Sequence, residues 1–157
     1  MSFTLDKDTD NYATDKNGWE IIKDYIPHDK KIWSPFYCDG KQKEYFKEMG
    51  YDIIHEDEDF FLNNKGDIII DNPPYSKWFN ICFRLKELEK PFILIAPPRA
   101  FTTKKFQNLF KDHLQIIIPN KRPTFTKLNE ESIGYTPPFG VWYFCYKMNL
   151  EKDLNFI

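Results

Sequence analysis

The stretch Ile68-Ile69-Ile70-Asp71-Asn72-Pro73-Pro74-Tyr75-Ser76-Lys77-Trp78 decides how the rest of the chain is interpreted. Its first part is a short β-branched run without alternation, the pattern of a strand buried on both faces of a parallel α/β sheet. The two prolines fix their own φ angles and push the residues before them toward extended conformations, so the chain leaves the strand as a stiff loop. Asn72 and Tyr75 are therefore expected beyond the carboxyl end of a strand, where open α/β sheets hold their ligands.

This loop can bind a planar amino group through two hydrogen-bond acceptors. The side-chain oxygen of Asn72 and the backbone carbonyl of Pro73 are two neutral acceptors, able to hold both amino hydrogens. Holding them orients the nitrogen lone pair toward an electrophile and offsets the positive charge that grows on nitrogen during alkylation. Tyr75 supplies a ring face on which a flat heterocycle can stack. A Pro-Pro turn that only caps a strand is the structural alternative.

Asp71-Asn72-Pro73-Pro74-Tyr75 resembles the catalytic loop of S-adenosylmethionine-dependent amino methyltransferases, above all the DNA adenine N6 methyltransferases of phages and large viruses. The resemblance implies a Rossmann-like class I methyltransferase fold, with a mostly parallel sheet, helices on both faces and an antiparallel C-terminal hairpin strand. It also implies S-adenosylmethionine as the cofactor and a catalytic role for Asn72, Pro73, Pro74 and Tyr75. Protein-glutamine and RNA-guanine methyltransferases use the same loop, so the substrate stays open at this point.

Composition limits the class of protein. The 157 residues, 41% of them hydrophobic, suffice for one buried core and are too few for two. Cys38, Cys82 and Cys145 are odd in number and widely spaced, which argues against a disulfide framework or a metal site and favours an intracellular compartment, cytoplasmic or virus-associated. No apolar run approaches a membrane span, and the N-terminus has no basic-then-apolar leader.

The net charge of −2 hides an asymmetry. Residues 1–72 carry 9 Lys and Arg against 17 Asp and Glu, a net charge of −8, whereas residues 73–157 carry 13 against 7, a net charge of +6. An acidic half for a cationic cofactor and a basic half for phosphates fit a nucleic-acid-modifying enzyme. Ordinary solvated surface charge is an equally good account.

The hydrophobic pattern predicts alternating strands and helices in a single domain, residues 1–157. A lead-in and short helix occupy residues 1–30, the core sheet 31–118, a candidate substrate-binding hairpin loop 119–139, and the last strand 140–157, with a loose tail from 151. The chain before the Ile68 strand leaves room for a short helix at most. Strands are expected at 31–33, 50–55, 68–70, 92–96, 114–118 and 140–146, and helices at 19–26, 41–49, 79–88 and 102–113.

The turn after the first strand is expected to bind the cofactor. Pro35, Phe36 and Gly40 stand in register with the Asp-Pro-Phe-x-Gly-x-Gly turn of the resembled family, while Ser34 and Cys38 depart from it. Glycine lets a ligand approach the backbone closely at such a turn, and Cys38 replaces the first of the two glycines. A plain strand-to-helix turn is the alternative.

A segment before this turn is implied as a further cofactor contact. Tyr12-Ala13-Thr14 matches the Tyr-x-Thr-Pro segment that contacts the methionine end of the cofactor in the resembled family, except that Asp15 stands where Pro is usual. N-capping of the first helix by Thr14 or Asp15 accounts for the same residues equally well.

An acidic run at the end of the second strand completes the expected cofactor site. Glu56 or Asp57 would accept hydrogen bonds from the ribose hydroxyls. Asp59-Phe60 resembles the Asp-Phe pair whose Asp accepts from the adenine amino group and whose Phe packs on the adenine ring. A solvated acidic loop is the alternative.

The loop at 119–139 is expected to hold the substrate, because it is too long for an idle connection in a compact domain. Lys121 and Arg122 would contact phosphates, and Phe125 would sandwich the target base as an aromatic of the family's last hairpin does. A Phe that merely packs on the core is the alternative.

The sequence therefore favours methyl transfer from S-adenosylmethionine to the N6 amino group of adenine in DNA, on a flipped or single-stranded base. The expected partner is nucleic acid, DNA rather than RNA, and no membrane or metal is expected. Methylation of an RNA base or a protein glutamine is the first alternative. A catalytically silent binding or structural protein, which Ser34 and Cys38 would suit, is the second.

Overall fold

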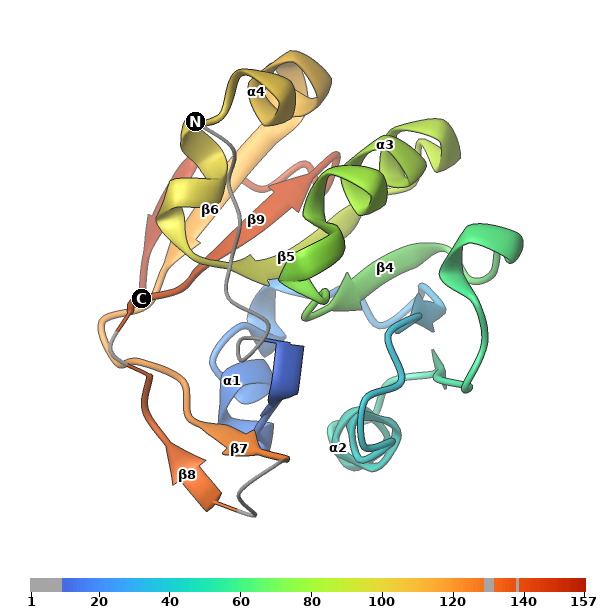
Figure 1. The fold of residues 1–157 in the computed structure, drawn as a ribbon, viewed down its shortest axis with the longest axis vertical. Helices are drawn as coiled ribbons and strands as arrows, with labels where there is room; N and C mark the ends of the chain where they lie inside the picture. The colour runs from blue at the N-terminus through green and yellow to red at the C-terminus, as the bar shows by residue number, and fades with distance from the viewer. Residues whose placement is uncertain (1–9, 129–131, 138) are drawn as a thin grey trace.

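The computed structural model describes residues 10–128, 132–137 and 139–157 (Figure 1). Its centre is a seven-stranded sheet in the order β10-β6-β9-β5-β4-β2-β3. Strand β9 runs antiparallel to both β5 and β6, and the other neighbouring pairs are parallel. These strands are β2 (Ile32–Trp33), β3 (Ile53–Ile54), β4 (Ile68–Asp71), β5 (Phe92–Ala96), β6 (Leu114–Ile118), β9 (Trp142–Tyr146) and β10 (Leu154–Phe156).

Helices cover both faces of this sheet. On one face lie α3 (Trp78–Leu88) and α4 (Lys104–Phe110), joined by Trp78 and Phe106, whose ring centroids are 5.7 Å apart. On the other lie α1 (Lys16–Glu20) and α2 (Gln42–Glu48), joined by Trp19 and Phe46 at 5.5 Å. This mostly parallel sheet between helices, with its antiparallel β9, confirms the predicted α/β class and is compatible with a Rossmann-like fold.

Strand β4 shows why the pattern of its residues led to this architecture. Successive side chains of a strand point to opposite faces. Ile69 accordingly packs among the residues of α3 and α4, whereas Ile68 and Ile70 pack on the other side with Phe46 of α2. An unbroken β-branched run therefore fills both cores at once.

Short single-turn helices connect the longer elements. The only helical turn between β3 and β4 is η3, so the prediction of a short or missing helix there is confirmed. Thr103 caps α4 by accepting a hydrogen bond from the backbone N–H of Phe106. These turns are η2 (Lys23–Tyr25), η3 (Phe60–Leu62), η4 (Tyr75–Lys77), η5 (Pro98–Thr102) and η6 (Lys111–His113).

A second, antiparallel sheet has the order β1-β7-β8. Its strands are β1 (Tyr12–Thr14), β7 (Phe125–Lys127) and β8 (Ser132–Tyr135). The described part of the predicted lead-in thus contains a strand, β1, which pairs with β7 of the β7–β8 hairpin far along the sequence, while residues 1–9 of the lead-in lie outside the described residues. Among the described residues, no helix has the length and apolar character needed to cross a bilayer.

Two predicted elements are wrong. Residues 151–157 are not a loose tail, because β10 pairs in parallel with β6 and the buried Asn155 donates a hydrogen bond to the Ile116 carbonyl at 3.2 Å. The helix predicted at 19–26 starts earlier, at Lys16, and gives way after Glu20 to the single turn η2. Both errors arise where contacts distant in sequence decide the local structure.

Candidate active site

A cavity of about 360 Å³ lies at the carboxyl ends of β2 and β4, within the size range of small-molecule sites. The turn that follows β2 and the loop that follows β4 both line it. The N-terminal strand β1 and the loop around η3 contribute the rest of the wall. The lining residues are 10, 12–14, 35–39, 42, 58–61, 71–74, 77 and 81.

Most of the predicted cofactor and catalytic residues meet at this cavity. Those that line it are Tyr12, Thr14, Pro35, Phe36, Asp59, Phe60, Asn72, Pro73 and Pro74. Those outside the lining are Gly40, Glu56, Asp57 and Tyr75. None of the predicted substrate residues Lys121, Arg122 and Phe125 lines it. The turn after β2 and the loop after β4 therefore face the same space, as expected for two segments that follow parallel strands of one sheet.

The buried carboxylate of Asp71 joins the turn to the loop. Its Oδ2 accepts from the hydroxyl of Ser34 at 2.9 Å and from the backbone N–H of Phe36 at 2.7 Å. Its Oδ1 accepts from the backbone N–H of Asn72 at 2.7 Å and from the side-chain amide of Gln42 at 3.3 Å. Burial raises the pKa of Asp71 to about 7, against the opposing effect of these hydrogen bonds. One carboxylate thus fixes both halves of the site.

Sequence reasoning gave Asp71 no role of its own, and it counted Ser34 as a departure from the family pattern. The structure shows that Ser34 is a hydrogen-bond partner of Asp71, and that Gln42 of α2 donates to the Ser34 hydroxyl at 2.6 Å. A buried acidic residue at the end of an apolar strand was the available signal, because such a group needs several donors nearby.

Neighbouring residues form hydrogen bonds with both the nitrogen and the oxygen of the Asn72 side-chain amide. Its Nδ2 donates to the hydroxyl of Thr14 in β1 at 3.1 Å. The Tyr75 hydroxyl lies 2.7 Å from Asn72 Oδ1 and 2.6 Å from the Ile95 carbonyl oxygen. A second link joins the loop to the N-terminal segment, since the backbone N–H of Ser76 donates to Asp10 at 3.1 Å. The amide of Asn72 is therefore positioned before any ligand binds.

Tyr75 lies beneath the cavity rather than at its surface. Only 4% of it is exposed, and its ring packs against Trp78 with centroids 6.1 Å apart. Its hydroxyl orients Asn72, while its ring offers no open face in this conformation. The stacking role expected for the ring stays a prediction.

The turn that follows β2 contains two residues in the left-handed region. Gly40 has φ of 77°, and a Cβ there would lie 2.6 Å from the Tyr37 hydroxyl oxygen. Cys38 has φ of 55°, so it adopts a glycine-like conformation at the position where the family pattern has glycine. Cys38 thus gives the turn the backbone conformation that a glycine would adopt, and that conformation is strained for a residue with a Cβ.

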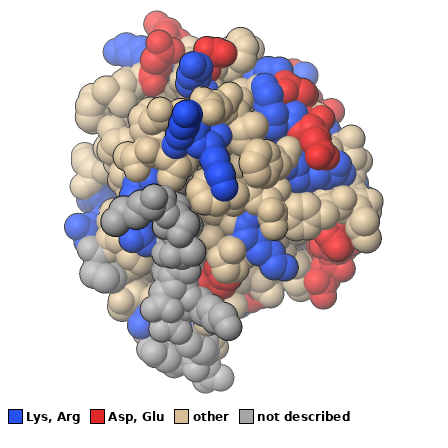
Figure 2. All heavy atoms as spheres, turned by 45° about the horizontal axis from the view of Figure 1, so that its top comes forward, with Lys and Arg blue, Asp and Glu red and all other residues tan. Residues whose placement is uncertain are grey.

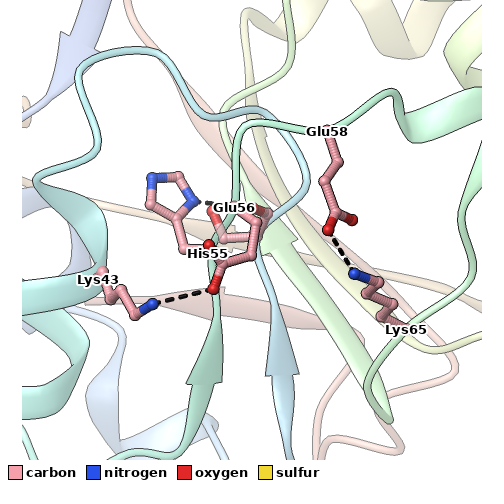
Figure 3. A network of polar contacts seen from close by, with 6 residues as sticks. Lys43, His55, Glu56, Glu58 and Lys65 are labelled. Atoms are coloured by element: carbon pink, nitrogen blue, oxygen red, sulfur yellow. Dashed lines mark hydrogen bonds and ion pairs between the residues drawn. The ribbon is translucent and has the colours of Figure 1, made fainter.

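The acidic loop after β3 contributes the expected Asp59 and Phe60 to the cavity lining, but neither Glu56 nor Asp57. Asp59 caps η3 by accepting from the Phe61 N–H at 2.8 Å, and Phe60 packs against Phe36 with centroids 5.0 Å apart. Glu56 is paired with Lys43 at 3.0 Å, outside the cavity lining (Figure 3). Glu58, which sequence reasoning did not single out, lines the cavity, although it also contacts Lys65 (Figure 3).

The predicted substrate residues lie away from the cavity lining. Lys121 and Arg122 are exposed in the connection between β6 and β7. Phe125 is 3% exposed and packs edge-on against Tyr12 at 6.3 Å, so the structure favours the core-packing alternative over a base sandwich. Tyr12 and Tyr135 instead form a stacked, half-buried pair with centroids 5.7 Å apart. In the described part of the chain, no cluster of His, Cys, Asp and Glu is arranged for a metal ion.

Among known proteins, this chain is similar to the Type II methyltransferase M.EcoRI of Escherichia coli. The two are 29% identical over 89 residues, which cover 47% of this chain and 27% of that protein. The similarity is to a methyltransferase. It supports methyl transfer in general, with S-adenosylmethionine as the implied donor. No protein-family model matches the chain, and no solved structure does.

Proposed function

We propose that this protein transfers a methyl group from S-adenosylmethionine to the N6 amino group of adenine in DNA. The observation that carries the proposal is the Asp71 carboxylate, which joins the cofactor turn to the Asn72-Pro73-Pro74 loop at one cavity. Similarity to a Type II methyltransferase over part of the chain supports the same reaction type. The choice of adenine rests on the resemblance of the loop to adenine N6 methyltransferases.

The residues of the cavity fit a cationic, partly aromatic cofactor. Five carboxylic acids line it, against the single cation Lys77 among the described lining residues. A cavity of this charge stabilises a cationic ligand. The acids are Asp10, Asp39, Glu58, Asp59 and Asp71. S-adenosylmethionine, when bound, supplies a methyl group activated by a positively charged sulfur.

Two neighbouring groups of the loop would hold the amino group that receives the methyl. The Asn72 side-chain oxygen accepts from Tyr75 and has a second lone pair for a substrate N–H. Pro73 lines the cavity beside Asn72, and its backbone carbonyl would supply the second acceptor. With both amino hydrogens held, the nitrogen lone pair forms the new N–C bond as the C–S bond breaks, and the electron pair stays on sulfur. The surplus proton then leaves the nitrogen for water.

The experiment that tests this function offers labelled cofactor to several substrates. The protein is incubated with S-adenosylmethionine carrying a tritiated methyl group and, separately, with duplex DNA, single-stranded DNA, RNA and a protein extract. We expect label in DNA, released on hydrolysis as N6-methyladenine, and label that accumulates about a hundredfold more slowly when Asn72→Ala replaces the wild type. Label in RNA or on glutamine would transfer the reaction to that substrate. No label anywhere, with no heat of binding for the cofactor at millimolar concentration, would leave a catalytically silent protein.

A further inference from the structure

The carboxyl edge of the large sheet changes its charge from one end to the other. Strands β3, β2, β4, β5 and β6 all run in the same direction, so the segments that follow them lie along one edge (Figure 1). Asp39 and the acidic run 56–59 follow β2 and β3. The segments that follow β4, β5 and β6 are basic: residues 73–86, 90–111 and 113–128 contain no Asp or Glu.

The lysines of the two ends also differ in their partners. At the acidic end, Lys43 and Lys65 are in ion pairs with Glu56 and Glu58. At the basic end, Lys104 and Lys105 at the start of α4 are exposed, and no carboxylate of the described residues pairs with either. Figure 2, turned so that the α3 and α4 end of the molecule comes forward, shows Lys and Arg side chains that stand apart from acidic atoms.

Packing holds this positive charge close to the cavity. The Lys105 ammonium lies 4.9 Å from the centre of the Phe79 ring, which links α4 to the start of α3. The preceding residue of that segment, Trp78, stacks on Phe106 of α4. Lys77, next in line, is in the cavity lining. Lys105 and Lys77 thus both lie at the start of α3, next to the loop that carries Asn72.

We infer that Lys104 and Lys105 bind the phosphates of the nucleic-acid strand whose base enters the cavity; the identity of that base rests on the proposed function. When an unpaired ammonium binds a phosphate, counterions condensed on the nucleic acid are released. This release contributes affinity that does not depend on the base sequence. The strand would cross the edge over η5 and α4, on the side of β4 opposite the acidic end. Arg99 in η5 lies on the same course.

The apolar surface of the molecule favours nucleic acid over an anionic membrane. A helix that lies in a membrane interface exposes large apolar side chains. Helix α4 instead buries Phe106 and Phe110, and the large exposed hydrophobic residues of the described chain lie elsewhere. They are Tyr37, Phe61, Leu62, Phe83, Leu128, Leu154 and Phe156. The surface of α4 thus offers charge without apolar anchors.

The test measures how DNA binding depends on salt, in the absence of cofactor. Dissociation constants for fluorescent single-stranded and duplex DNA are compared for the wild type and Lys104→Ala/Lys105→Ala over a series of salt concentrations. For each phosphate that the variant no longer neutralises, the slope of log affinity against log salt should fall by about 0.7 on single strands and about 0.9 on duplex. Lys104→Arg/Lys105→Arg should restore the wild-type slope.

A matched control removes the same charge from the opposite edge. Lys30 precedes β2 and Lys47 lies in the last turn of α2; both are exposed, and neither has a carboxylate partner among the described residues. Lys30→Ala/Lys47→Ala should leave the slope unchanged. An equal fall in both double variants would mean that only net charge matters, and an unchanged slope in Lys104→Ala/Lys105→Ala would remove α4 from the interface; either result overturns the inference. So would variants that lose binding to phosphatidylserine vesicles but keep DNA binding.

The outcome is separable from that of the proposed function. Asn72→Ala should bind DNA with the wild-type salt slope and transfer methyl about a hundredfold more slowly. A wild type that binds DNA through α4 but methylates nothing would refute the reaction and keep the phosphate surface. A wild type that methylates DNA with no contribution from Lys104 and Lys105 would do the reverse.

Discussion

The acidic and basic ends of the carboxyl edge are built in different ways. At the acidic end, the acidic side chains have partners: Asp71 accepts from the Ser34 hydroxyl and from the backbone N–H groups of Phe36 and Asn72, and Glu56 pairs with Lys43. At the basic end, Lys104 and Lys105 have no carboxylate partner in the described chain. Changes at the acidic end should therefore act on folding and on the geometry of the site. Changes at the basic end should act on binding alone, and salt should mask them.

The largest effect is expected from Asp71 and depends on pH. Its pKa is raised from 3.8 to about 7 in the folded protein because the carboxyl is buried. The contribution of this group to stability is therefore fully present below pH 3.8 and is lost as the pH rises through about 7. The total loss is about 4 kcal/mol. We expect the difference in the free energy of unfolding between wild type and Asp71→Asn, measured in urea, to shrink or reverse as the pH rises from acid to neutral. A difference constant over that range would contradict the assignment.

Asn72 lies where the two ends meet, and its effect should be on the chemical step. Asn72→Ala removes one of the two acceptors for the amino group, so single-turnover methylation of an adenine oligonucleotide should slow by about a hundredfold. The affinity for cofactor should barely change. Tyr75→Phe is a milder variant, because it keeps the ring and loses only the hydroxyl that orients Asn72. It should slow methyl transfer by a smaller factor than Asn72→Ala does. If Asn72→Ala transfers methyl at the wild-type rate, the loop is only a strand cap.

Cys38 tests whether the acidic end carries strain. Because a left-handed non-glycine residue costs energy, Cys38→Gly should raise the free energy of unfolding by about 1 kcal/mol. Cofactor affinity, measured by titration calorimetry, should stay the same or rise. Cys38→Ser keeps the strain and should behave as wild type in both measurements. A Gly variant less stable than the Ser variant would show that the φ of 55° is comfortable in this turn.

The smallest effect is expected from Lys121 and Arg122. Both are exposed, and Arg122 donates to the carbonyl of Pro137 at 3.3 Å. Lys121→Ala/Arg122→Ala should lower the salt slope of DNA binding by about one for each phosphate that these side chains neutralise in the wild type. Its unfolding curve in urea should match that of wild type. If these two substitutions destabilise the protein, the basic end also contributes to folding, and the proposed difference between the two ends is wrong.

Local patterns in the sequence were sufficient for the elements that bury their own side chains. The strand at 92–96 is found with the predicted bounds, and α3 begins one residue before the predicted start, because unbroken apolar runs and helical spacing each reflect burial directly. The loop at Asn72 was also foreseeable, since two prolines leave few conformations. Its position beside the turn at Pro35 followed from parallel strands having their carboxyl ends at one edge.

Interactions between distant segments account for what the sequence did not reveal. Asp71 and Ser34 are 37 residues apart, and no local pattern indicates their hydrogen bond. Phe125 looks like any aromatic in a basic loop until β1 pairs with β7 and places it under Tyr12. Strand β10 has only three residues, too few for a local pattern to reveal it, so its pairing with β6 is what makes it a strand.

Strand β10 bears on how this protein should be handled in solution. Its pairing covers the outer edge of β6, where Ile116, Ile117 and Ile118 follow one another. An uncovered, β-branched edge is a template on which a second chain can pair, and it leads to aggregates. Trimming residues 151–157 as dispensable would expose that edge. We would expect the shortened protein to precipitate during expression, although every residue of its cavity is still in the chain.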